Sequence, residues 1–365
     1  MTILYDEGQQ AIATETRRAL EARVSMEELL PLLENSGEYH EPFWTLAKEQ
    51  GWTALTLPEA HGGLALGLIE LGLVAHQAGR TMSGAPFLTS GFGAAKAIAL
   101  YGSDAQKARW LPGLASGETI GAIAFAGGPD ILPSRPDATF ADGRLGGLSR
   151  GVTGGLKADV AIVLAADAAG TPALLLADLA PVRRTAVASF DNSRCIADLH
   201  FETTAAETLL IGTEARDAAL HILALQAVVT AHEQTGGAEM LMEIARDYAV
   251  TRKAFGQPIG AFQSVKHRIA ELYGLVELAR ANCIHAAARE GQADFLKAAA
   301  AARLSASEAY DTAARDCIQI HGGIGVTWDI GLHLHMRRAR SLAIEQGSGL
   351  FWEDVLVDQL AEETA

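Results

Sequence analysis

Hydrophobic positions repeat along this chain with two different periods. Up to about residue 118, apolar residues recur at three- and four-residue spacing between glycine and proline breaks, which is typical of amphipathic helices. The same spacing returns after about residue 212. The N-terminal helices are expected at residues 7–24, 26–35, 41–50, 69–79 and 94–100.

The middle of the chain instead has short β-branched or aliphatic runs separated by glycine. Runs of this length between turn residues predict the strands of a compact sheet domain. We expect strands at residues 120–125, 138–140, 160–164, 173–176, 184–189 and 197–201. The predicted fold is therefore mainly α with a β middle domain, divided into an N-terminal helical domain (1–118), a middle β domain (119–211) and a C-terminal helical bundle (212–365).

A polar joint interrupts the C-terminal helical pattern between residues 252 and 270. Gly256, Pro258 and Gly260 break the periodicity, and a new helix is expected to begin near Gln263. The joint is rich in donors, a composition that suits a phosphate or an extended polar cofactor as well as an ordinary connection between helices. These donors are Arg252, Gln257, Gln263, Lys266 and His267.

The helices that follow the joint are expected to form a bundle. An apolar stripe at helical spacing indicates which face of the first helix is buried, and an alanine-rich segment at 295–318 predicts another helix. A second glycine turn follows at 317–325, and the sequence Met336-Arg-Arg-Ala-Arg340 predicts a basic patch. The stripe consists of Val265, Ile269, Leu272, Val276, Ala279 and Cys283.

Composition narrows the function classes. The chain has 365 residues, 49% of them hydrophobic, and its net charge of −15 argues against a nucleic-acid or anionic-membrane partner. Cys195, Cys283 and Cys317 fit neither a disulfide framework nor a metal site, and the latter two are expected in the core. The N-terminus lacks a basic region followed by an apolar one, and no apolar run could span a bilayer. We expect a cytoplasmic protein that binds no metal.

Two motifs in the C-terminal part occur in a specific order. R-x-x-F-G-x-x-I-x-x-F-Q begins at Arg252, and Q-I-x-G-G-x-G begins at Gln319, before R-R-x-R. Together they resemble the C-terminal helical domain of the acyl-CoA dehydrogenases. Gly51-Trp52 and the segments 58–63, 106–112 and 116–118 resemble signatures of the family's N-terminal domain, where we expect tight turns and buried tryptophans. The resemblance implies a β-barrel-like middle domain, a C-terminal four-helix bundle and FAD as the cofactor.

The resemblance also assigns a cofactor-binding surface. It implies that seven residues reach across a subunit interface to hold the adenosine diphosphate half of a neighbour's FAD. By contrast, residues 122–130 and 151–154 lack most side chains that contact the flavin ring in the family, although Thr153 remains as one hydroxyl donor. The seven residues are Arg252, Phe255, Phe262, Gln263, Gln319, Gly322 and Gly323.

The resemblance further implies a carboxylate base that takes the α proton of an acyl thioester while a hydride leaves the β carbon for the flavin. Matching Met336–Arg340 to the family places Gln346 at the base position, and a neutral amide cannot accept that proton. Glu345 is adjacent, but consecutive side chains diverge in direction. The family's other base position falls on Gln226-Ala227. Glu233 and His232, on the same helix, are better explained as structural.

This pattern most resembles the non-catalytic partner subunit of bacterial heterotetrameric (α2β2) acyl-CoA dehydrogenases, which act on bulky CoA thioesters such as steroid side chains. The implied partners are a homologous subunit with an intact base, an acyl-CoA substrate and an electron-transfer flavoprotein as acceptor. The implied product is an α,β-unsaturated thioester. Two alternatives stay open: a self-sufficient homomeric dehydrogenase with a shifted base at Glu345, and a binding or regulatory flavoprotein.

Overall fold

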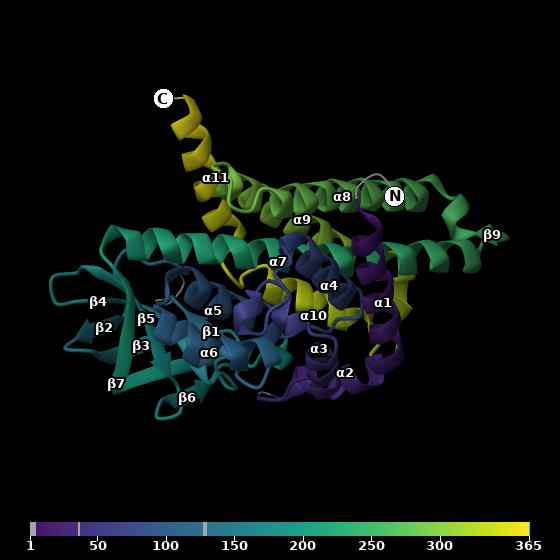
Figure 1. The fold of residues 1–365 in the computed structure, drawn as a ribbon. Coiled ribbons are helices and arrows are strands. Elements are labelled where there is room, and N and C mark those ends of the chain that lie inside the picture. The colour runs from purple at the N-terminus through teal and green to yellow at the C-terminus, as the bar shows by residue number, and fades with distance from the viewer. Residues whose placement is uncertain (1–4, 36, 127–129, 365) are drawn as a thin grey trace. The chain divides into compact units, whose positions relative to one another are not determined.

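The structure is a computed structural model that describes residues 5–35, 37–126 and 130–364 (Figure 1). Its internal contacts divide the chain into two compact units. The first, here called the bundle unit, contains residues up to 30, residues 68–83 and the chain from 227 on. The second, the sheet unit, contains residues 31–67 and 84–226.

The bundle unit is built from long helices. α7 (Thr213–Thr251) enters it from residue 227 and ends where the sequence predicts the joint, and α8 (Gln263–Ala288) begins at the predicted position. α9 (Phe295–His321) lies beside α8 and confirms the alanine-rich helix (Figure 1). The other helices of this unit are α1 (Glu7–Arg23), α4 (Leu68–Arg80), α10 (Leu332–Leu342) and α11 (Gly349–Thr364).

Small residues set the spacing of the helices in this unit. A Cβ added at Gly79 of α4 would lie 1.9 Å from the carbonyl oxygen of Glu233, and one added at Gly236 would lie 1.9 Å from that of His76. α4 and α7 therefore approach each other with backbone against backbone, which only glycine permits. The predicted stripe on α8 is buried from Leu272 to Cys283.

The described residues of the sheet unit form a sheet of seven strands. The sheet order is β1-β4-β2-β3-β7-β5, and β5 also pairs with β4, so five of these strands close into a ring while β6 pairs with β7. This arrangement confirms the β-barrel-like middle region. The strands are β1 (Gly121–Ala124), β2 (Ala138–Ala141), β3 (Arg144–Val152), β4 (Val160–Ala166), β5 (Pro172–Asp178), β6 (Arg183–Ala186) and β7 (Ala197–Ile211).

Helices of the sheet unit pack against these strands. α5 (Phe87–Tyr101) contacts β1, and α6 (Asp104–Ser116) contacts α5. The helix α3 (Glu41–Glu49) also lies wholly within this unit, while α2 (Met26–Glu34) crosses the boundary between the units in the sequence. The barrel interior is apolar: every residue of β4 is buried, which explains its uninterrupted aliphatic sequence.

The structure corrects several local expectations. β3 was not predicted, because Gly146, Gly147 and Gly151 interrupt its apolar pattern. Residues 106–112 lie on helix α6 and not in a tight turn, and Trp110 is only half-buried, whereas Trp52 is buried as expected. β7 continues well past residue 201, because a bulge opposite β3 carries its register through polar residues.

Candidate functional site

Two glycine-containing turns meet at one end of the bundle unit. α7 ends at Thr251 and leads into a short hairpin of β8 (Lys253–Ala254) and β9 (Gln257–Pro258), and α9 ends at His321 before the turn Gly322–Val326. The rings of Tyr248 and His321 stack with centroids 4.0 Å apart. This contact brings the two sequence motifs, some seventy residues apart in the chain, to the same place.

The hairpin presents aromatic surface to solvent. Phe255 is 97% exposed, and its ring meets that of Phe262 edge to face with centroids 6.2 Å apart. Phe255 has φ +52° and Gly256 has φ +83°. A tight left-handed turn therefore holds the phenyl ring outward. An aromatic side chain exposed to this extent suits contact with another molecule.

The same surface carries uncommitted donors. The side chains of Arg252, Gln263 and Gln319 are exposed, and none of them hydrogen bonds to any described residue. A Cβ at Gly322 or Gly323 would meet no atom within 4 Å. Open backbone beside free amide and guanidinium donors is the arrangement that receives an extended anionic group such as a diphosphate.

A second cluster surrounds Gln346, in the turn between α10 and α11. Gln346 has φ +54° and is 7% exposed. Thr230 Oγ1 on α7 donates to Gln346 Oε1 at 2.9 Å, and Trp352 Nε1 donates to the Gln346 carbonyl oxygen at 3.0 Å. The amide is therefore fixed on both its side chain and its backbone.

A buried arginine organises this turn. Arg303 of α9 is 1% exposed, and its Nη2 donates to the carbonyl oxygens of Glu345, at 2.7 Å, and of Leu342. Its Nη1 donates to Gln234 Oε1. Burial lowers the pKa of Arg303 to about 10, and the charges of Glu345 and Glu233 oppose that shift. The guanidinium therefore caps the carboxyl end of α10 as a buried cation.

A buried ion pair lies on the same helices. Arg338 Nη1 of α10 is 2.9 Å from Glu233 Oε1 of α7, and both side chains are 4% exposed. Arg338 also donates to the carbonyl oxygens of Ser83 and Met82, each at 3.1 Å. The predicted basic patch is therefore wrong at its centre, because Arg338 points into the bundle unit. Arg340 is exposed and pairs with Asp311 at 2.9 Å.

His232 is a structural residue. It is 4% exposed, and its Nδ1 donates to the carbonyl oxygen of Val228 at 2.8 Å. Burial lowers the pKa of His232 to about 4, so the ring is neutral at physiological pH. With Glu233 committed to Arg338, the two residues form no acid–base pair, as the sequence indicates.

Comparison with known proteins identifies the family. The model for the acyl-CoA dehydrogenase N-terminal domain matches residues 6–118, and the model for the C-terminal domain matches residues 216–362. Acyl-CoA dehydrogenase IpdE2 of Mycobacterium tuberculosis is 33% identical over 306 residues, covering 84% of this chain and 82% of its own. The chain belongs to the acyl-CoA dehydrogenase family.

Solved structures of acyl-CoA dehydrogenases share the whole fold. A variant of the Tcur3481-Tcur3483 steroid ACAD has a TM-score of 0.85 at 27% identity, covering 98% of this chain and 99% of the other. The ChsE4-ChsE5 complex from Mycobacterium tuberculosis has a TM-score of 0.88 at 25% identity, covering 99% of both chains. The chain thus has homologues among the steroid-type members of the family.

FAD is the cofactor of the acyl-CoA dehydrogenases, and the exposed donors described above fit its diphosphate half. On the ring side, Thr153 is half-buried just after β3, and its hydroxyl has no partner among the described residues. Residues 127–129 of the weakened ring-side loop lie outside the described residues. The seven residues assigned to the nucleotide surface stay a prediction.

The residue that the sequence match assigns to the family's second base position lies in the sheet unit. Gln226 is 1% exposed, and its Nε2 donates to the carbonyl oxygen of Thr89 at 3.1 Å. Gly93 leaves room for this amide, since a Cβ there would lie 2.5 Å from Gln226 Nε2. An ionised carboxylate at this position could not donate that hydrogen bond and would face the carbonyl oxygen of Thr89 with like charge.

Sequence reasoning missed Thr230 and Arg303. The signal for Arg303 was present, because it lies at helical spacing from Ala299, Ala306 and Tyr310 on an otherwise apolar stripe. Cys283 and Cys317 are buried as expected, Cys195 is buried as well, and burial raises the pKa of Cys283 to about 12. Within the described residues no His, Cys, Asp and Glu cluster could hold a metal, and no helix is long and apolar enough to cross a membrane.

Proposed function

We propose that this chain is the base-lacking subunit of a heteromeric, flavin-dependent acyl-CoA dehydrogenase. The observation that carries the proposal is the buried amide of Gln346, which accepts a hydrogen bond from Thr230 and which the motif match aligns with the family's base position. An amide held in this way has no lone pair that titrates near neutral pH, so it does not remove an α proton. FAD, when bound, supplies the acceptor for the hydride.

A shifted base at Glu345 has less support. Glu345 is 6% exposed, and its charge opposes the lowering of the pKa of Arg303. Its carboxylate compensates the charge of the buried guanidinium, and a neutral side chain in its place would leave that cation less well compensated. A general base must take up a proton in each turnover, so this environment suits a structural role for Glu345.

In this proposal, the exposed turns of the chain complete the FAD site of the partner subunit. Arg252, Gln263 and Gln319 would donate to the diphosphate of the FAD in a partner subunit, and Gly322 and Gly323 would let the backbone approach it closely. Phe255 and Phe262 would pack at the interface between the subunits. The free donors and the 97% exposure of Phe255 support this arrangement.

The relatives suggest the substrate and the partners. One solved relative is a variant of a steroid ACAD, and another is a complex of two different chains, ChsE4 and ChsE5. We infer a bulky, steroid-type CoA thioester as the substrate, converted to its α,β-unsaturated form in the cytoplasm. The partner would be a homologous subunit with an intact glutamate base, and an electron-transfer flavoprotein would accept the electrons.

The flavin content of the purified protein tests this proposal. The chain would be expressed alone and together with a family member that has glutamate at the base position, and flavin absorbance would be measured per subunit. We expect little flavin on the chain alone and a stoichiometric amount on the complex. Circular dichroism of the isolated chain provides the folding control. A folded homomer that binds one flavin per chain and turns over an acyl-CoA would overturn the proposal.

A further inference from the structure

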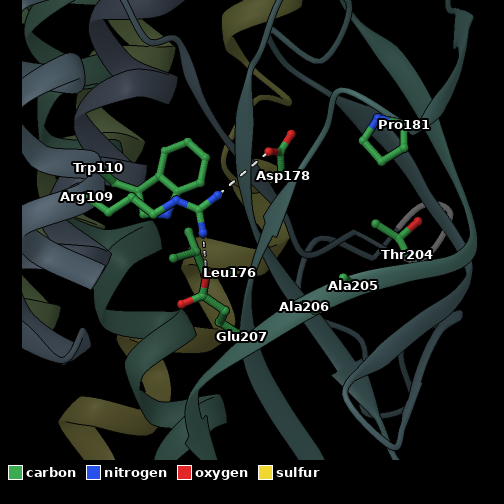
Figure 2. Close-up of a pocket in the computed structure, with 9 residues that line it drawn as sticks. All are labelled: Arg109, Trp110, Leu176, Asp178, Pro181, Thr204, Ala205, Ala206 and Glu207. Atoms are coloured by element: carbon green, nitrogen blue, oxygen red, sulfur yellow. Dashed lines mark hydrogen bonds and ion pairs between the residues drawn. The ribbon is translucent and has the colours of Figure 1, made fainter. Parts of the chain in front are cut away.

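In the sheet unit, the pocket beside the 106–112 segment already holds an arginine between its acidic residues (Figure 2). Arg109 Nη1 donates to Glu207 Oε1 at 3.0 Å, and Arg109 Nη2 lies 4.0 Å from Asp178 Oδ2. The guanidinium carbon is 4.6 Å from the centre of the Trp110 ring. Because the protein's own cation lies between these carboxylates, no ligand is needed there to balance them.

In the bundle unit, an aromatic pair joins the last turns of α7 and α9. The rings of Tyr248 and His321 stack with centroids 4.0 Å apart and an angle of 22° between their planes. His321 is 6% exposed and Tyr248 is half-buried. The imidazole is therefore packed against the phenol ring and is not presented to a ligand.

The turn that follows α9 is tied to His321. The Nδ1 of His321 donates to the carbonyl oxygen of Cys317 at 2.7 Å, which fixes the orientation of the imidazole. A Cβ added at Gly325 would lie 3.0 Å from His321 Cβ and 2.5 Å from the carbonyl oxygen of Ile318. The turn Gly322–Val326 therefore folds back closely on the end of the helix, an approach that glycine permits.

The hairpin that follows α7 is tied to Tyr248. The carbonyl oxygen of Tyr248 accepts hydrogen bonds from the backbone N–H of Arg252 at 2.8 Å and from Thr251 Oγ1 at 3.2 Å. The carbonyl oxygen of Arg252 accepts from the backbone N–H of Ile259, also at 2.8 Å, across the hairpin of β8 and β9. A displacement of Tyr248 would therefore move Arg252 and the hairpin with it.

The donors of the proposed diphosphate site lie on both of these segments. Arg252 follows α7, and Gln319 lies in the last turn of α9, two residues before His321. Because the two donors are far apart in the chain, local structure does not fix their separation. A ligand that receives hydrogen bonds from both binds more tightly when their separation is set before binding, since less ordering then opposes association.

We propose that Tyr248 and His321 are a positioning pair for the nucleotide surface. Their stack sets the separation of Arg252 and Gln319 so that both donate to one diphosphate, and neither ring contacts the ligand. The inference rests on the proposed function, which supplies the FAD of a partner subunit as the ligand. It adds two residues to those that the family resemblance assigns to this surface.

Titration of the deflavinated complex with FAD tests the positioning role. The chain is assembled with its base-carrying partner, and the change in flavin fluorescence gives the dissociation constant. His321→Ala and Tyr248→Leu should each weaken FAD binding by about 2–10-fold, the range expected from the loss of one aromatic pair. His321→Phe and Tyr248→Phe keep two stacked rings and should stay within about 2-fold of the wild type.

A second tyrosine–histidine pair in the bundle unit provides the matched control. Tyr310 Oη and His335 Nδ1 are 2.9 Å apart, and both residues are 1% exposed. His335→Ala removes this pair, which joins α9 to α10, and should lower thermal stability while leaving FAD affinity unchanged. Circular dichroism shows whether each variant is folded at the temperature of the titration. Equal weakening of FAD binding by His335→Ala and His321→Ala would reduce the effect to stability and refute the positioning role.

A double-mutant cycle between the two donors measures the positioning itself. In the wild type, Arg252→Ala and Gln319→Ala together should cost less binding free energy than the sum of the single variants, because each donor holds the diphosphate within reach of the other. In the His321→Ala background the cycle should be closer to additive. Wild-type FAD affinity in His321→Ala, or equal coupling in both backgrounds, would overturn the proposal.

Failure of this inference is distinguishable from failure of the proposed function. The proposed function fails on the flavin content and turnover of the chain expressed alone. If that experiment yields a homomer that binds flavin, the same FAD titration with the same variants applies to the homomer. The positioning role fails only on the FAD affinity and coupling of the His321 variants.

Discussion

Replacement of Glu233 by glutamine should destabilise the bundle unit severely, although glutamate and glutamine side chains have the same shape. Glu233 and Arg338 are 2.9 Å apart with both side chains 4% exposed. In the variant the guanidinium keeps its hydrogen bonds to the carbonyl oxygens of Ser83 and Met82 but loses its counter-charge. A cation in the low-dielectric interior would then lose the carboxylate charge that its Nη1 contacts.

The expected magnitude follows from the loss of that carboxylate charge. Removing one partner of a buried ion pair costs about 3–5 kcal/mol. Total stabilities of domains are about 5–15 kcal/mol, so Glu233→Gln should remove a large fraction of the free energy of unfolding. A surface substitution such as Glu353→Gln should change it by less than about 0.5 kcal/mol.

Urea unfolding at pH 7, followed by circular dichroism, measures these differences. A double-mutant cycle with Arg338→Met completes the test, because the double variant should be less destabilised than the sum of the two single variants. A Glu233→Gln variant within about 1 kcal/mol of the wild type, or an additive cycle, would refute the reasoning. A loss of turnover in this variant must therefore be judged on folded protein before any catalytic role is assigned to Glu233.

Three further outcomes are expected. Burial lowers the pKa values of His232 and His335 to about 4 and about 3, so the unfolded chain binds protons that the folded chain excludes. The free energy of unfolding should therefore decrease as the pH falls below about 6.5, by about 2 kcal/mol per histidine at pH 5. In urea titrations at a series of pH values, His335→Gln should make the free energy of unfolding depend less on pH. Gly79→Ala should cost about 3 kcal/mol in the same titrations, whereas Gly274→Ala, which meets no atom within 4 Å, should gain about 0.5–1 kcal/mol. Arg252→Ala should leave stability unchanged and reduce flavin retention by the assembled complex roughly 10-fold or more, measured by absorbance after gel filtration.

The elements that could be predicted from the sequence are those that local residues mark, either at their ends or along their length. Gly256, Pro258 and Gly260 mark the joint between α7 and α8 because glycine and proline end helices wherever they occur. The alanine-rich run became α9 for a similar reason, since alanine is the best helix former. The strand β3 was not predicted because glycines interrupt its alternation of apolar and polar residues. Its place in the sheet depends on pairing with β2 and β7.

The buried polar clusters could not be predicted in this way, because their partners are distant in sequence. From the sequence alone, Arg338 is interpreted as a surface charge, because its partner Glu233 is 105 residues away in the chain. Gln346 could be assigned from its motif, but its Thr230 partner is 116 residues away. Periodicity predicts which face of a helix is buried and does not reveal which distant side chain compensates a charge on that face.

The most direct test of the central claim compares the turnover of two variants of the assembled heteromeric complex. One variant carries Glu345→Gln in this chain, and the other has glutamine in place of the base glutamate of the partner subunit. Flavin content and circular dichroism would first establish that each variant complex is folded and loaded. Loss of a true general base typically costs about 10²–10⁴-fold. We expect the partner variant to lose activity on that scale and the Glu345→Gln complex to stay within a few fold of the wild type. Collapse of turnover in the Glu345→Gln complex, with flavin still bound, would contradict the account and assign the base to this chain.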